Sequence, residues 1–161
     1  MTQEEIDAYI QEVEARIEDI CERAKAEVDT KLRPARELIS EVKSFMSKGV
    51  DLISTTQLQE WAMAIPVINS GIVPYKEVFA LTKNLWDIET RQLSAKNLLE
   101  FDRKKTEVDA INKIATTTNA KKSAIAEYVQ NMLAGTQESL WMLGNTIRKI
   151  LDARIAGGDT K

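Results

Sequence analysis

PYKEVFALTKNLWDIETRQLSAKNLLEFDRKKTEVDAINKIA, residues 74–115, is the stretch that decides the fold. Pro74 stands where a first helical turn tolerates a missing N–H, and no further Pro or Gly interrupts the stretch. Most of its apolar residues recur at intervals of three, four or seven positions, which places them on one helix face: Val78, Leu81, Leu85, Ile88, Ala95, Leu99, Phe101, Val108, Ile111 and Ala115. At ~1.5 Å per residue this helix would be about 60 Å long, so we predict an elongated antiparallel helical bundle or coiled coil.

Composition predicts an all-α protein without catalytic chemistry. Only three Pro and six Gly interrupt 161 residues, of which 43% are hydrophobic. The chain contains no His, which excludes a Ser-His-Asp triad and a His-containing zinc site. Its single cysteine, Cys21, cannot form an intrachain disulfide, and we interpret it as a small half-buried residue. We therefore expect one domain, no enzyme activity, no cofactor and no metal.

Residues 1–53 are predicted to form a kinked rod. A heptad seam opens the rod and continues through Pro34 to Gly49, which favours one kinked helix over two helices in line. We expect self-association through its first members: Ile6, Ile10, Val13, Ile17 and Ile20. Ten acids and three bases give residues 1–29 a net charge of −7, and the rest of the chain carries +4. This asymmetry favours pairing of the first helix with later ones, within the chain or between the subunits of a homo-oligomer.

Residues 54–73 are predicted to form a short helix and an apolar loop. Ser54, Thr55 and Thr56 offer N-caps for the helix. Two β-branched runs then flank residues 69–71, Asn-Ser-Gly, a pattern typical of a β-hairpin. We define the apolar tip as Trp61, Ile65, Ile68, Ile72 and Tyr75. Its side chains have three possible environments: the end of the bundle, an oligomer or partner interface, or a membrane.

The layout of long helices with an apolar hairpin at one end resembles that of α-helical pore-forming toxins, in architecture and not in any motif. The resemblance implies a protein that acts by inserting its tip into a membrane.

A turn is predicted at residues 116–119, Thr-Thr-Thr-Asn, which separates the central helix 74–118 from a C-terminal helix 119–156. Residues 157–161 begin with two glycines and are predicted to be a flexible tail. Gly135 and Gly144 lie inside the last helix, where a close approach of another helix beside Trp141 would compensate their low helix propensity.

Basic residues gather around the end of the predicted central helix. We interpret five of them as a possible nucleic-acid contact: Arg103, Lys104, Lys105, Lys121 and Lys122. Acids are interspersed among them, so a solvated helix face and a partner for the acidic first helix are the competing interpretations.

The N-terminus is acidic and lacks the pattern of a secretory signal. The longest uncharged run, residues 61–75, is shorter than the ~20 residues that span a bilayer, so we expect a cytoplasmic protein. The function that fits these patterns best is that of a noncatalytic structural or adaptor protein that self-associates and binds partners. A nucleic-acid-binding accessory protein and a membrane-active protein are the alternatives.

Overall fold

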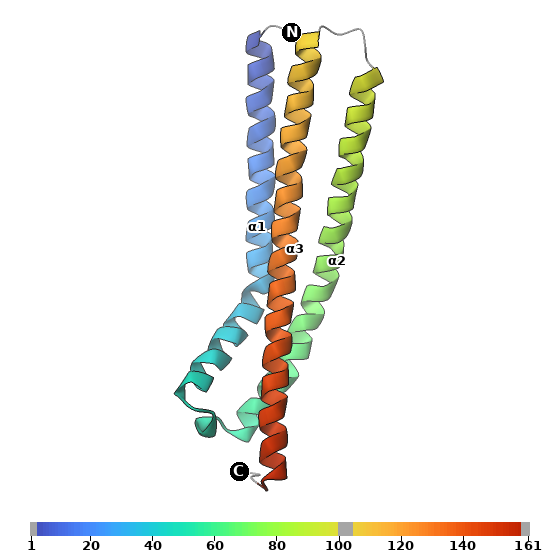
Figure 1. The fold of residues 1–161 in the computed structure, drawn as a ribbon. Helices are drawn as coiled ribbons and strands as arrows, with labels where there is room; N and C mark the ends of the chain where they lie inside the picture. Colours follow the sequence, from blue (N-terminus) through green and yellow to red (C-terminus); the bar gives the residue numbers. More distant parts are fainter. Residues whose placement is uncertain (1–2, 100–104, 159–161) are drawn as a thin grey trace. The chain divides into compact units, whose positions relative to one another are not determined.

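The computed structural model describes residues 3–99 and 105–158, and these are all-α as predicted (Figure 1). The helices in this part of the chain are α1 (Gln3–Lys48), α2 (Thr55–Leu99) and α3 (Lys105–Ala156). A short 3-10 helix, η1 (Val50–Leu52), lies between α1 and α2.

The chain divides into two compact units. The first unit contains Met1–Glu27 and Glu77–Gln130, and the second contains Val28–Lys76 and Asn131–Lys161. A segment of each long helix belongs to each unit. Within a unit, α1 and α3 run in the same direction and α2 runs in the opposite direction (Figure 1).

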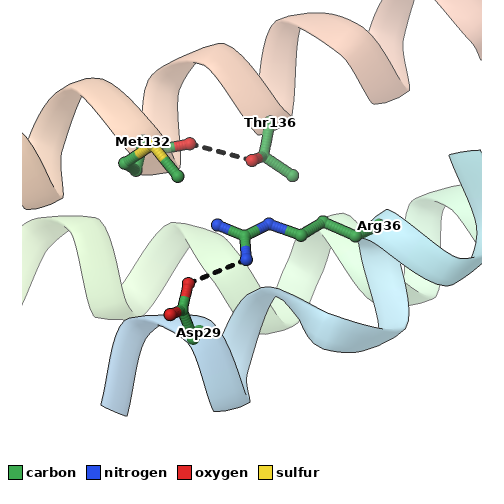
Figure 2. Close-up of polar contacts among 4 residues, drawn as sticks. All are labelled: Asp29, Arg36, Met132 and Thr136. Atoms are coloured by element: carbon green, nitrogen blue, oxygen red, sulfur yellow. Dashed lines mark hydrogen bonds and ion pairs between the residues drawn. The ribbon is translucent and has the colours of Figure 1, made fainter. Parts of the chain in front are cut away.

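In the second unit, α1 buries the seam that its spacing predicts. Its buried members are Val28, Leu32, Ala35 and Val42, whereas the predicted member Ile39 is half-buried and its neighbour Leu38 is buried instead. Helix α1 continues through Pro34, which lies on its exposed face, so the continuous-helix interpretation is confirmed. An ion pair joins the two sides of this proline, because Arg36 Nη1 donates to Asp29 Oδ1 at 2.7 Å (Figure 2).

Local chemistry ends α1 and begins α2 where the sequence predicts. Gly49 follows the last residue of α1 with φ of 122°, a conformation that favours glycine. Its N–H donates to the carbonyl of Met46 at 3.2 Å. The hydroxyl of Ser54 accepts a hydrogen bond from the N–H of Gln57 at 3.1 Å, which is N-cap geometry.

The predicted hairpin is wrong. Helix α2 runs from Thr55 to Leu99, straight through residues 65–75 and both of its prolines. The residues of the apolar tip belong to a longer heptad line, which we call the inner stripe: Leu58, Trp61, Ile65, Ile68, Ile72, Tyr75 and Phe79. Five of these are buried, which is worth on the order of 8–15 kcal/mol. Two prolines and one glycine inside a helix cost about 7 kcal/mol, so burial of the stripe outweighs the local turn chemistry.

Gly71 provides a test of this helix. Its φ is not positive, and a Cβ at this position would meet no atom within 4 Å. We therefore expect Gly71→Ala to raise the free energy of unfolding by about 0.5–1 kcal/mol, measured by urea denaturation. Gly49→Ala is the control, because its positive φ strains any other residue, and this change should destabilise the protein by at least about 1 kcal/mol. If Gly71→Ala destabilised the protein, this result would contradict the helix at residues 65–75 and support the hairpin.

The boundaries of the central helix also differ from the prediction. The described parts of residues 74–118 belong to α2, up to Leu99, and to α3, from Lys105, and these two helices run in opposite directions within the first unit (Figure 1), so the stretch is not one helix. The predicted turn at 116–119 lies inside α3. The hydroxyls of Thr116 and Thr117 donate to the carbonyls of Asn112 and Lys113 at 2.7 and 2.9 Å, which satisfies them without leaving the helix. Thr136 makes the same bond to Met132 at 2.8 Å (Figure 2).

The end of α3 agrees with the sequence. Helix α3 ends at Ala156, and Gly158 adopts a φ of 76°. Residues 159–161 of the predicted tail lie outside the described residues. A Cβ at Gly144 would lie 3.6 Å from Ile65 Cγ2, so α2 approaches α3 closely there. No such approach exists at Gly135, where a Cβ would meet nothing within 4 Å.

Candidate protein-interaction surfaces

The seam predicted for self-association is partly used within the chain. Ile17 is buried in the first unit and Val13 is half-buried, whereas Ile20 is exposed. The side chains of Ile6 and Ile10 lie outside the described residues. Because Ile17 already packs against its own chain, this seam is not a continuous free surface.

The apolar tip is likewise part of the core of the second unit. Trp61, Ile65 and Ile72 are buried, and Ile68 and Tyr75 are half-buried. Of the three environments considered for these residues, the structure places them in packing within the chain.

A second apolar line runs along α2 on a different face. We call it the outer stripe: Val78, Leu81, Leu85 and Ile88. The sequence predicts these residues as the buried seam, but their exposed fractions lie between 50% and 61%. Phe79 is buried instead. At 3.6 residues per turn the outer stripe lies about a third of a turn from the inner stripe, most of which belongs to the second unit. Within the first unit, α2 buries Phe79 and leaves the outer stripe exposed.

The outer stripe is large enough to matter energetically. Full burial of one Val, Leu or Ile side chain is worth ~1.5–3 kcal/mol, and about half of each member is still in water. Covering all four would therefore yield on the order of 3–6 kcal/mol. Contiguous apolar patches of this kind on soluble proteins mark interaction sites.

The first unit also contains an open groove between α1 and α3, with a volume of about 520 Å³. We call it the α1–α3 groove, and its lining residues are Ile17, Glu18, Cys21, Glu22, Lys25, Lys121, Ala124, Ile125 and Tyr128. Two small side chains, those of Cys21 and Ala124, leave space between the helices. The groove thus has an apolar floor with charged residues at its margins.

Two of the residues predicted to bind nucleic acid have described side chains, Lys121 and Lys122, and these two have different neighbours. Lys121 lines the α1–α3 groove together with two acids of α1, Glu18 and Glu22. Lys122 turns to a different neighbour, because its Nζ lies 5.9 Å from the ring centroid of Trp86. Arg103 and Lys104 lie outside the described residues, as does the side chain of Lys105, the first residue of α3.

Charged groups elsewhere form ion pairs along α1. Arg16 pairs with Glu12 at 3.0 Å and Arg23 with Asp19 at 2.9 Å, each one turn apart and well exposed. Such pairs support a helix modestly and do not create a site.

Within residues 3–99 and 105–158, no group of three or more acidic or cysteine side chains is placed to hold a metal ion. In the same part of the chain, no helix combines the length and the apolar character needed to cross a bilayer. Comparisons with protein-family models, with curated proteins and with solved structures give no match for this chain.

Proposed function

We propose that the protein is a noncatalytic helical structural or adaptor protein that acts by self-association, and that the outer stripe of α2 is the surface it uses. The observation that carries this proposal is the exposure of four large apolar side chains in one unbroken heptad line. Heptad lines of this kind are how helices bury each other in coiled coils and bundles.

The free energy gained by burying the outer stripe determines how apolar the surface that receives it must be. Association costs ~4–15 kcal/mol in lost translational and rotational freedom. The ~3–6 kcal/mol from one outer stripe is comparable with the lower end of that range. The surface that receives the stripe must therefore also be apolar, which favours a protein surface over a nucleic acid.

The two alternative functions have less support. A nucleic-acid role needs basic side chains that face one strand, but Lys121 lies among acids and Lys122 lies over an indole ring. A membrane role through the apolar tip needs exposed apolar residues there, but Trp61, Ile65 and Ile72 are buried.

Removal of the outer stripe tests the proposal. Leu81→Gln combined with Leu85→Gln keeps good helix formers on α2 and removes about 2–3 kcal/mol of burial from each contact, so self-association should weaken roughly thirty- to a hundredfold. Light scattering across a concentration series should show the wild type above the chain mass of 18.1 kDa and the variant close to it.

Trp141→Gln combined with Met142→Gln is the matched control, because both side chains are large, apolar and exposed, and they belong to the second unit whereas the stripe belongs to the first. This control should keep the mass of the wild type. A wild-type protein that is monomeric at all concentrations, or a stripe variant with unchanged mass, would refute the proposal.

A further inference from the structure

We propose that the outer stripe of one copy docks into the α1–α3 groove of a second copy, so that the protein assembles head to tail. This inference rests on the proposed function and adds the identity of the receiving surface. Both surfaces belong to the first unit, and different helices build them.

The two surfaces match in length and in chemistry. The lining residues on α1 extend from Ile17 to Lys25, about 12 Å along a helix, and the outer stripe extends about 15 Å from Val78 to Ile88. Small residues at a helix–helix contact let the backbones approach closely, and Cys21 and Ala124 supply them on either side of the floor. An incoming helix would cover this floor and bury its own stripe at the same time.

Charge favours the groove over a second stripe as the receiving surface. The described residues beside the outer stripe include one charged side chain, Glu77, together with Thr82 and Asn84. A stripe packed on a stripe would offer Glu77 no cation among them. Because α1 and α3 run in the same direction in the first unit (Figure 1), the groove has Lys121 near one end and Lys25 near the other. The groove also contains Glu18 and Glu22, so it offers two cations beside two acids, whereas the described side chains along a second stripe offer no cation. Glu77 would therefore approach a lysine whichever way the incoming helix runs.

A contact between two different surfaces has a consequence for assembly. Each docked pair leaves one free stripe and one free groove. Head-to-tail contacts of this kind continue until they close into a ring or extend into a filament. We therefore expect wild-type assemblies to exceed two copies as concentration rises.

Complementation between two variants tests the inference. Ala124→Arg places a long cation in the groove at an exposed position, and the Leu81→Gln, Leu85→Gln variant removes the stripe and leaves the groove intact. Each variant alone should associate at least about tenfold more weakly than the wild type. An equimolar mixture should form a complex of twice the 18.1 kDa chain mass, because one intact stripe can still meet one intact groove.

Ala134→Arg is the control for the groove variant, since it makes the same change at an exposed position of α3 in the second unit, and it should keep the mass of the wild type. Circular dichroism checks that all variants retain their helix content. If Ala124→Arg keeps the wild-type mass while the stripe variant is monomeric, or if the mixture stays monomeric, the inference is overturned and the proposed function stands. A stripe variant with wild-type mass, or a monomeric wild type, overturns both.

Discussion

Ile72→Ser should lower the free energy of unfolding by about 3–5 kcal/mol, whereas Val67→Ser should change it by less than about 0.5 kcal/mol. Both residues are aliphatic and lie five positions apart on α2. Ile72 belongs to the inner stripe and is 3% exposed, while Val67 is 70% exposed. The change at Ile72 removes apolar contacts, leaves a cavity and buries a hydroxyl, and the change at Val67 does none of these.

Urea denaturation followed by circular dichroism measures both effects. A loss of 3–5 kcal/mol is a large share of the ~5–15 kcal/mol that stabilises a typical domain, and it corresponds to a fall in melting temperature of roughly 10 °C. If residues 65–75 formed an apolar loop, Ile72→Ser and Val67→Ser should change the free energy of unfolding by similar amounts. Equal effects of the two substitutions would therefore contradict the burial of the inner stripe.

Local chemistry in the sequence predicts where α1 ends, where α2 begins and where α3 ends, together with much of the buried face of α1. Gly49 ends α1, Ser54 caps α2, and the two glycines after Ala156 end α3. These signals act within four residues of the chain, so tertiary structure does not override them. The buried seam of α1 is predicted for the same reason, since a helix with one apolar line has only one face to bury.

Residues 65–75 show where local signals fail. Two prolines and an Asn-Ser-Gly sequence indicate a turn, and these are contacts between near neighbours. The competing signal is the heptad line that continues from Leu58 to Phe79 on both sides of the segment. Measured over three heptads, that line predicts the helix. Within the eleven residues 65–75 alone, the two prolines and the Asn-Ser-Gly sequence predict a turn instead.

The outer stripe and the groove depend on information that periodicity does not contain. Helix α2 carries two apolar lines of the same spacing, and spacing alone does not show that the inner stripe is buried while the outer stripe stays exposed. The groove arises because Cys21 on α1 and Ala124 on α3 line the same space, although about a hundred positions separate them in the chain. The sequence between Leu99 and Lys105 contains no Pro or Gly, so local signals do not predict that α2 and α3 are separate helices.

Trp61→Ala should lower the free energy of unfolding by about 3–5 kcal/mol, and Trp141→Ala should leave it within about 0.5 kcal/mol. Trp61 is 2% exposed and its indole Nε1 donates to Glu41 Oε1 at 3.2 Å. Its ring meets Phe45 edge to face, with centroids 5.6 Å apart and planes at 62°, a geometry worth ~0.5–1.5 kcal/mol beyond burial. Trp141 is 69% exposed and serves as the control for the loss of an indole.

Trp61→Phe separates the two contributions to this effect. Phenylalanine keeps most of the apolar contact and removes the donor to Glu41, whose exposed carboxylate can then bind water, so the loss should be about 1–2 kcal/mol. Thermal and urea denaturation of the three variants measure the order Trp61→Ala, Trp61→Phe, Trp141→Ala from most to least destabilised. If Trp61→Ala were as mild as Trp141→Ala, the α1–α2 contact at Trp61 and Phe45 would not stabilise the second unit.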